Sequence, residues 1–203
     1  MSSLCLAAEL ADRLQLGEPA IFPTDTLPAL ASRPDHAAQL WALKQRPQHK
    51  PLILMGACAA DLWPWLGDAP QSAWLELADR HWPGGLTLVV PAASDLVQLL
   101  HPGGDSVGLR VPACPLAQAL LELSGPLATT SANRSGEQPC LSADEAAERF
   151  PEVARLGPLP WPQPLGQAST VVRWQTTGGW EVLRHGAVLP DELSPRRQPS
   201  NGA

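Results

Sequence analysis

The sequence predicts an α/β fold with a twisted, open, mixed but mostly parallel sheet that is flanked by helices. Segments with helical periodicity alternate with short apolar runs over most of the 203 residues. Two strand-like runs near the end are separated by a Thr-Thr-Gly-Gly turn, which indicates a hairpin. The residues are 44% hydrophobic and 17% charged, a normal balance for a packed globular core.

Each element follows from the period of its apolar residues and from the residues that end it. Helical spacing from Leu4 to Leu14 is ended by Gly17. Ser142 and Glu145 form a predicted capping box at the start of another helix. The predicted helices cover residues 4–16, 36–44 (with Asp35 as its N-cap), 57–66, 69–81, 115–123 and 143–150. The predicted strands cover residues 19–22, 51–55, 86–90, 107–111, 127–130, 169–174 and 180–184.

The length suits one domain with a short appendage. We expect a single domain over residues 1–189 and a disordered polar tail over residues 190–203. Four prolines between Pro158 and Pro164 exclude a helix or a central strand there, so an extended surface loop is expected.

Composition narrows the class of protein. The formal net charge of −6 does not favour nucleic-acid binding, which usually needs a basic face, although a local basic groove is still allowed. The N-terminal segment carries acidic residues and no basic region, unlike a signal peptide, and no apolar run has membrane-spanning length. The four cysteines are scattered, which argues against a metal knuckle or a redox pair. We therefore expect a soluble, cytoplasmic protein that binds no membrane.

Polar side chains follow the predicted strands at the points where they end. Thr26 follows the first strand, Arg110 ends another, and Ser131 and Asn133 follow a third. Ligands bind at the carboxyl ends of strands in open α/β sheets, so these residues are candidates for one site. Taken singly, each also has a plain structural interpretation as a turn, a cap or a surface ion pair.

The only two lysines, Lys44 and Lys50, lie on either side of Arg46. A lysine ammonium is a compact point charge that suits a phosphate or a carboxylate. The sequence has no Walker-type loop, no dinucleotide-binding glycine motif and no pattern for a catalytic triad or a metal cluster. Cations and hydroxyls without a nucleophile suit a site that binds a nucleotide triphosphate and a carboxylate together.

These segments resemble the YrdC/TsaC family of threonylcarbamoyl-AMP synthases, in its short bacterial form with a single domain. The resemblance extends in family order from about residue 5 to residue 188. The matching motifs are Ile21–Thr26, Leu43–Leu52, Trp82–Thr87, Val107–Pro112, Thr130–Gly136, Ser169–Val172 and Leu183–Gly186.

The resemblance implies a nucleotidyltransferase that converts L-threonine, bicarbonate and ATP, with Mg²⁺ on the phosphates, into threonylcarbamoyl-AMP and pyrophosphate. The product would feed the t6A modification of tRNA at position 37, with partner proteins of the TsaD, TsaB and TsaE type and contact with tRNA or double-stranded RNA. No catalytic residue or protein metal ligand is assigned. The ATP-binding residues that it implies are Lys44, Arg46, Lys50, Ser131, Asn133 and Arg184. The threonine-binding residues that it implies are Thr26, Arg110 and Ser169, with Thr87 and Ser106 as weaker candidates.

One segment departs from the family pattern, and it leaves alternatives open. The family usually has an aromatic residue and a glycine where this chain has Pro28 and Ala29, in a loop expected to border the amino-acid pocket. Pro28 lacks an N–H, and Ala29 adopts a left-handed backbone less easily than glycine. One alternative is therefore an enzyme of the same fold that makes another acyl- or carbamoyl-adenylate. The other alternative is a non-catalytic paralogue that binds RNA or the ribosome.

Overall fold

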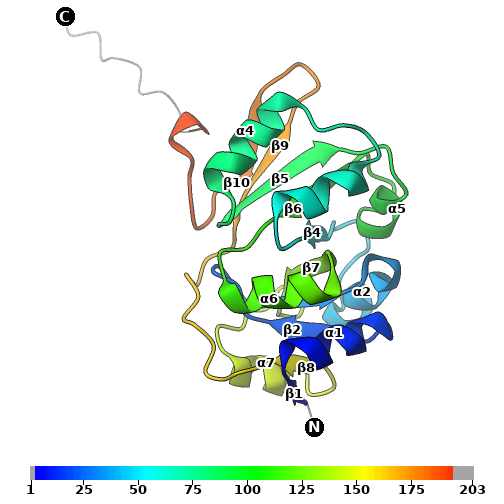
Figure 1. Cartoon of the computed structure of the whole chain (residues 1–203), viewed down its shortest axis with the longest axis vertical. Helices are drawn as coiled ribbons and strands as arrows, with labels where there is room; N and C mark the ends of the chain where they lie inside the picture. Colours follow the sequence, from blue (N-terminus) through cyan, green and yellow to red (C-terminus); the bar gives the residue numbers. More distant parts are fainter. Residues whose placement is uncertain (1–2, 194–203) are drawn as a thin grey trace, which may run out of the picture.

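The computed structural model describes residues 3–193, which form one twisted sheet with helices packed on both of its faces (Figure 1). The sheet has ten strands in the order β1-β8-β2-β3-β7-β4-β6-β5-β9-β10. The strands are β1 Leu4–Cys5, β2 Ala20–Phe22, β3 Ala29–Ser32, β4 Ile53–Met55, β5 Leu86–Pro91, β6 Ser106–Arg110, β7 Leu127–Ser131, β8 Ala154–Leu156, β9 Thr170–Trp174 and β10 Trp180–Arg184.

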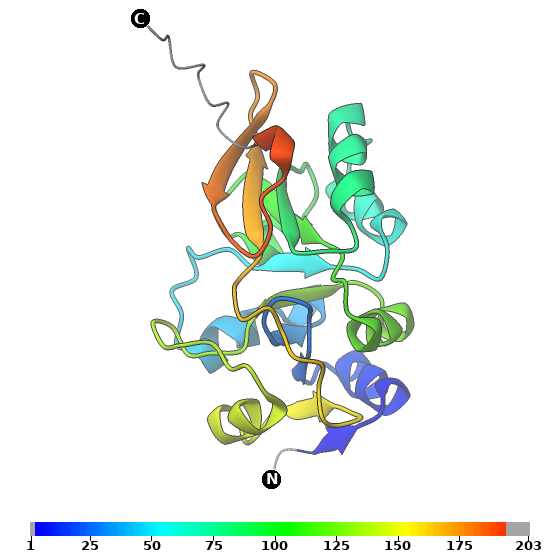
Figure 2. The ribbon, with the colours of Figure 1, turned by 90° about the vertical axis from the view of Figure 1, so that its left-hand side faces the viewer.

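The helices lie on two sides of this sheet. Helices α1, α3, α4 and α6 cover one side, and α2 and α7 lie on the other (Figure 2). The α-helices are α1 Ala7–Gln15, α2 Ala38–Lys44, α3 Ala59–Leu62, α4 Ser72–His81, α5 Leu96–Leu100, α6 Pro115–Ser124 and α7 Ala143–Arg149. Short 3₁₀ turns are η1 Pro34–His36, η2 Trp63–Leu66 and η3 Asp191–Leu193.

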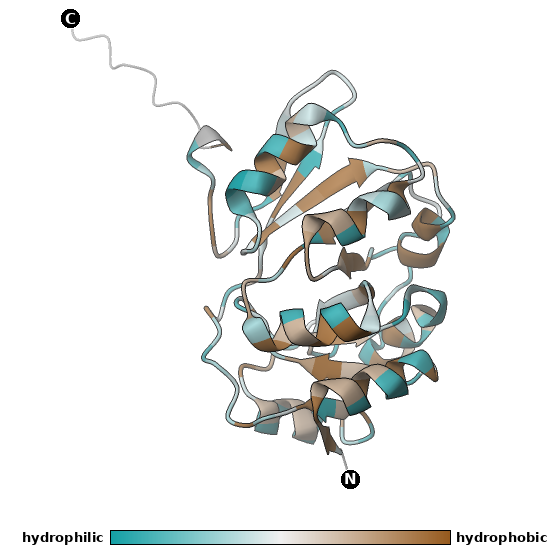
Figure 3. Cartoon of the chain, viewed as in Figure 1, coloured by the Kyte–Doolittle hydropathy of each residue, from teal (hydrophilic) through white to brown (hydrophobic). Residues whose placement is uncertain are grey.

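The core lies between the sheet and its helices. Hydrophobic residues are concentrated on the strands and on the helix sides that face them, and polar residues lie on the outer helix surfaces (Figure 3). The amphipathic helix α1 buries Leu10, Ala11 and Leu14 and packs beside α6. No helix within residues 3–193 is long and apolar enough to cross a membrane.

The predicted α/β class and mixed sheet are confirmed, but the strand pairings are nearly evenly divided. Four pairings are parallel and five are antiparallel, so parallel pairs are fewer than the sequence led us to expect. The main reason is β3, which follows β2 closely enough to pair antiparallel with it and is then antiparallel to β7 as well.

Most predicted elements are present within a few residues of their expected bounds. The short elements β1, β3, β8 and α5 were not predicted, because two to five residues carry too little periodicity to be recognised. Asp35 is not the N-cap of α2: it lies in η1 and accepts hydrogen bonds from Arg33, and α2 begins after Ala37.

Two expectations for surface segments have a partial outcome. The capping hydrogen bond from the Glu145 N–H to the Ser142 hydroxyl is present, but the Glu145 carboxylate accepts from Leu141 instead of Ser142. The predicted tail begins at Pro190, and its first residues form the turn η3. The rest of the predicted tail, residues 194–203, lies outside the described residues.

Candidate functional site

Two adjoining cavities hold most of the residues that the sequence nominated. The smaller cavity, of about 140 Å³, is lined by Thr26, Arg110 and Ser131 among others. The larger, of about 330 Å³, is lined by Thr87 and Ser106 among others. The residues that line both cavities are Arg46, Pro51, Ile53, Ser169 and Arg184. The sheet thus brings together residues from β4, β5, β6, β7, β9 and β10 with the loop before β3.

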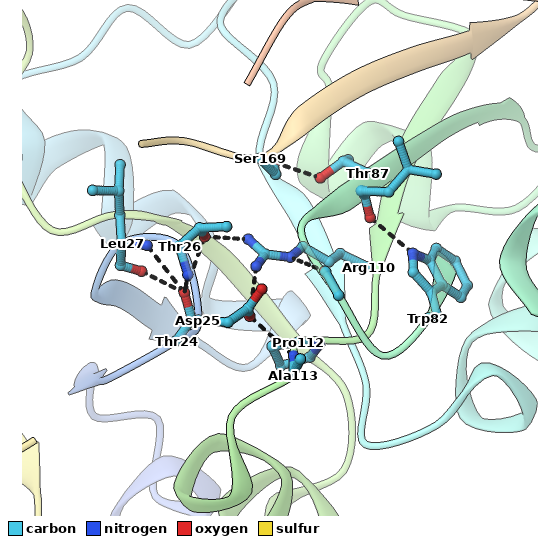
Figure 4. A network of polar contacts seen from close by, with 12 residues as sticks. Thr24, Asp25, Thr26, Leu27, Trp82, Thr87, Arg110, Pro112, Ala113 and Ser169 are labelled. Atoms are coloured by element: carbon cyan, nitrogen blue, oxygen red, sulfur yellow. Dashed lines mark hydrogen bonds and ion pairs between the residues drawn. The ribbon is translucent and has the colours of Figure 1, made fainter. Parts of the chain in front are cut away.

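Arg110 is the most firmly held cation of the site, and only 3% of its surface is exposed. Its Nη1 donates to the Thr26 hydroxyl at 2.7 Å, its Nη2 to Asp25 Oδ1 at 2.7 Å, and its Nε to the Gly84 carbonyl at 3.0 Å (Figure 4). Burial lowers the pKa of Arg110, and the charge of Asp25 acts in the opposite direction. These contacts fix the guanidinium beside Thr26 at one end of the smaller cavity.

The turn Thr24–Leu27 presents Thr26 to Arg110. The Thr24 hydroxyl accepts hydrogen bonds from the N–H groups of Thr26 and Leu27, both at 3.2 Å. Such hydroxyl-centred turns are a common use of threonine after a strand. The backbone N–H groups of Leu165 and Gly166 donate to the carbonyls of Asp25 and Thr26, so the proline-rich segment supports this turn from outside.

Arg46 and Arg184 form the wall that the two cavities share. Arg184 donates from Nε and Nη2 to the Ser169 carbonyl, and the Ser169 hydroxyl lies 2.8 Å from that of Thr87. Arg46 donates to the Pro51 carbonyl, but its buried Nε has no hydrogen-bond partner among residues 3–193. Burial lowers the pKa of both arginines, and the Arg184 charge lowers that of Arg46 further. Two partly buried cations that repel each other favour an anion between them.

Lys44 is buried and lines neither cavity. Only 1% of the residue is exposed, and its Nζ donates to the Ser131 carbonyl at 2.5 Å and to the Asn133 carbonyl and Oδ1. Burial lowers the pKa of Lys44 to about 7, and the Arg46 charge contributes in the same direction. The three oxygens accept all three hydrogens of the ammonium group. Lys44 is therefore bound to the end of β7 and to the loop that follows it.

The segment Ser131–Asn133 is a compact polar turn that Lys44 holds. The Ser131 hydroxyl donates to Asn133 Oδ1 at 2.6 Å, and the Asn133 amide nitrogen donates to the carbonyls of Arg134 and Glu137. Ser131 lines the smaller cavity, whereas Asn133 lines neither cavity. Asn133 therefore shapes the turn that presents Ser131.

Lys50 is exposed in the turn that follows Pro47, and it lines neither cavity. Its carbonyl accepts a hydrogen bond from the Trp41 indole at 2.9 Å, which fixes its backbone. The two lysines thus differ in environment, although they are close in sequence.

The profile of the Sua5/YciO/YrdC family, described as "Telomere recombination", matches residues 12–186. The chain belongs to this family. It is 38% identical over 153 residues to the threonylcarbamoyl-AMP synthase of Serratia proteamaculans, covering 73% of this chain and 81% of that one. It is 36% identical over 176 residues to the enzyme of the same name from Alkalilimnicola ehrlichii, covering 84% and 91%. The predicted activity is the one for which these relatives are named.

Solved structures of the family share the fold. Sua5 of P. abyssi complexed with L-threonine has a TM-score of 0.81 and 29% identity over 92% of this chain. This chain covers 57% of the length of that Sua5 chain, which is less than two thirds of it. YciO of E. coli has a TM-score of 0.78 at 21% identity, which supports the fold alone. The family and fold predicted from the sequence are confirmed.

The segment that departs from the family pattern lies in the wall of the smaller cavity. Leu27, Pro28 and Ala29 line that cavity. Ala29 is an extended residue of β3 that pairs with Phe22 and Ser131, so it needs no left-handed backbone. Pro28 still contributes through its carbonyl, which accepts from the Ala132 N–H at 2.8 Å. The glycine usual in the family is therefore not required here for backbone reasons.

Asp25 and His101 are two residues of the site that sequence reasoning missed. Asp25 was part of a recognised motif but had no role, although its carboxylate is the partner that holds Arg110 and also accepts from the Ala113 N–H at 2.9 Å. His101 lines the larger cavity. A single histidine in a turn carries no local signal of such a position, whereas an acidic residue beside Thr26 in a predicted site could have been nominated as the partner of Arg110.

Proposed function

We propose that this family member is an L-threonylcarbamoyladenylate synthase, which makes threonylcarbamoyl-AMP and pyrophosphate from L-threonine, bicarbonate and ATP. The observation that carries the proposal is the shared wall of the two cavities. There Arg46 and Arg184 lie close enough for the charge of Arg184 to act on Arg46. Among the described residues neither arginine forms an ion pair with a carboxylate, and Arg46 Nε has no hydrogen-bond partner. An anionic group between a small and a larger compartment would satisfy both arginines.

The compartments differ in the ligands that suit them. The smaller one has a buried hydroxyl and guanidinium at one end, from Thr26 and Arg110, and an apolar side formed by Leu27 and Met55. That combination suits a small amino acid with a hydroxyl and a methyl group, namely threonine as its carbamate. The larger compartment suits the nucleotide. We therefore assign Thr26, Arg110 and Ser169 to threonine. We place Thr87 and Ser106 beside the nucleotide because, of these two cavities, they line the larger one and not the smaller one.

The reaction then needs positioning and charge stabilisation more than a base. The threonine amine adds to carbon dioxide derived from bicarbonate and loses a proton, which forms the carbamate. A carbamate oxygen attacks the α-phosphorus of ATP, and the bond from that phosphorus to the bridging oxygen breaks, so pyrophosphate leaves with the electron pair. Arg46 and Arg184, at the junction of the compartments, would stabilise the charge that develops on phosphate oxygens. We assign no general base.

The resemblance to the family implied that Lys44, Lys50 and Asn133 bind ATP. For Lys44 and Asn133 we now propose an indirect role, in which the Lys44 ammonium holds the turn that presents Ser131 to ATP. Lys50 is exposed, and its long side chain suits the outer phosphates of a bound triphosphate. Mg²⁺ would arrive with ATP, bound by phosphate oxygens and water, as is common for this ion. The one carboxylate in the network described above, Asp25, is engaged by Arg110 and Ala113.

The product would be consumed by enzymes of the TsaD, TsaB and TsaE type, which would transfer the threonylcarbamoyl group to tRNA at position 37. A mixed anhydride of a carbamate and AMP is a reactive acyl donor, so a group-transfer step onto an amine must follow. Direct contact with tRNA or double-stranded RNA is a separate proposal, and it would need a local basic surface because the net charge is −6.

The test is to incubate the purified protein with ATP, Mg²⁺, bicarbonate and threonine, and to measure pyrophosphate and the adenylate by mass spectrometry. We expect pyrophosphate release that requires both threonine and bicarbonate. Because the smaller cavity has an unusual wall at Pro28 and Ala29, a panel of other amino acids belongs in the same experiment. Equal or faster turnover with another amino acid would show that threonine is not the preferred substrate. RNA retention that falls with salt, without any turnover, would favour the non-catalytic alternative.

A further inference from the structure

His101 lines the larger cavity but has no part in the reaction proposed above. It follows α5 directly, at the start of the turn that leads into β6. Its ring Nδ1 lies 3.1 Å from the Ser106 carbonyl oxygen. A carbonyl oxygen only accepts hydrogen bonds, so Nδ1 must carry the hydrogen. In the neutral ring Nε2 is then an acceptor, and it has no hydrogen-bond partner among residues 3–193.

The turn after His101 fixes which edge of the ring faces the cavity. The Gly104 N–H donates to the His101 carbonyl at 2.8 Å, which closes the turn around the ring. A methyl group placed on Gly104 would lie 2.2 Å from Nδ1 and 2.4 Å from Cε1, so the backbone approaches this edge as closely as only glycine allows. The Nδ1 edge is enclosed by the turn, which leaves the Nε2 edge to line the cavity.

The position along β6 indicates which part of a nucleotide would meet His101. Ser106 and Arg110 are the two ends of this strand, and at about 3.3 Å per residue they lie roughly 13 Å apart. The smaller cavity reaches the Arg110 end, and the larger cavity reaches the Ser106 end. If the α-phosphate lies at the shared wall between them, the nucleoside extends toward His101. The apolar side chains of Val89, Val171 and Leu183 line the same cavity and suit the faces of a purine ring.

We propose that His101 selects adenine by accepting, at Nε2, a hydrogen bond from the exocyclic amino group of the base. The inference rests on the proposed function, because it takes the larger cavity as the nucleotide site. Inosine and guanine nucleotides carry a carbonyl oxygen at that position of the ring. An acceptor on the base would then face the acceptor Nε2, and neither atom would gain a partner.

The test compares equilibrium binding of ATP and ITP, measured by calorimetry without threonine or bicarbonate. For the unaltered protein we expect ATP to bind about tenfold more tightly than ITP, and about tenfold more tightly than purine riboside triphosphate, which lacks the amino group. His101→Leu should abolish the preference, and His101→Gln should keep part of it because its amide oxygen can accept the same hydrogen bond. The matched control is His36→Leu, because His36 is exposed and lines neither cavity. This variant should keep the full preference for ATP.

Each outcome decides the inference independently of the proposed reaction. An unaltered protein that binds ATP, ITP and purine riboside triphosphate equally well would overturn it without any variant, even if His101→Leu does not fold. A preference that survives in folded His101→Leu would also overturn it. If the adenine preference depends on His101 but no threonine-dependent pyrophosphate is released, the inference holds and the proposed reaction fails.

Discussion

Lys44 and Asn133 are joined by two hydrogen bonds, because Lys44 Nζ donates to both the carbonyl and the side-chain oxygen of Asn133. The bonds connect the last residue of α2 to the loop after β7, across 89 positions of sequence. The Lys44 carbonyl also accepts from the Ser135 N–H at 2.9 Å, so backbone and side chain hold the same loop. The lysine thus orders a turn whose other end, Ser131, reaches the smaller cavity.

The first prediction is that Lys44 and Asn133 act as one unit on ATP binding. Lys44→Met and Asn133→Ala should each lower kcat/KM for ATP by about tenfold or more, since each leaves the other's polar groups unpaired in a buried place. The double variant should be little worse than the poorer single one. Arg46→Met is the matched control, and its effect should add to that of Asn133→Ala. Additive effects of Lys44→Met and Asn133→Ala would instead mean that Lys44 contacts phosphate by itself.

The second prediction is that the burial of Lys44 makes the free energy of unfolding depend on pH. Its pKa is lowered to about 7 by burial and by Arg46 and Arg149, with Cys140 acting in the opposite direction, against about 10.4 in an unfolded chain. Between these values the unfolded chain binds a proton that the folded protein has released, so the free energy of unfolding rises with pH. The slope contributed by this residue is at most about 1.4 kcal/mol per pH unit, and it disappears below pH 7, where both states are protonated.

The measurement is urea unfolding from about pH 7.5 to about pH 9.5 for the unaltered protein and for Lys44→Met. The free energy of unfolding should rise more steeply with pH in the unaltered protein, because all other titrating groups are common to the two. Parallel curves would show that Lys44 keeps its proton in the folded state throughout this range.

The third prediction is that Asp25 supports both stability and threonine binding through Arg110. Asp25→Ala would leave the Arg110 charge buried without its partner, which should cost about 3–5 kcal/mol of unfolding free energy. The milder Asp25→Asn keeps an acceptor for Arg110 and should raise KM for threonine with a smaller loss of stability. Asp35→Ala is the matched control, because the Arg33–Asp35 pair is on the surface and its loss should change stability by less than about 1 kcal/mol. Equal losses at the two sites would contradict the role given to Asp25.

The fourth prediction follows from the extended backbone of Ala29. Ala29→Gly should lower the free energy of unfolding by about 1–2 kcal/mol, because a glycine weakens a strand and the buried methyl group is lost. Gln45→Gly should have the opposite sign and raise stability by up to about 1 kcal/mol, since Gln45 ends α2 with a φ of 49° that favours glycine. Thermal unfolding of both variants tests this, and a stabilised Ala29→Gly would show that the residue is strained after all.

Much of the fold and of the site could be predicted because their signals are local. The helical spacing before Gly17, the apolar run at 51–55 and the hairpin turn near the end each depend on neighbouring residues, and all three elements are present. The motifs around Thr26, Arg46 and Ser131 could be nominated for the same reason. The short strand β3 could not, because Ala29–Ser32 has small residues and no alternation, and it becomes a strand only by pairing on both sides.

Local sequence patterns were enough to identify the α/β class, the family and the polar residues of a candidate site. Which of these residues meet depends on how distant segments are arranged in space. Arg110 reaches Thr26 across 84 positions of sequence. Thr87 reaches Ser169 across 82 positions because β5 and β9 are neighbours in the sheet. Lys44 likewise meets Ser131 across 87 positions, whereas Lys50, six residues further along the chain, is exposed. Spacing along a chain specifies faces and turns, whereas hydrogen-bond partners depend on which distant strands become neighbours.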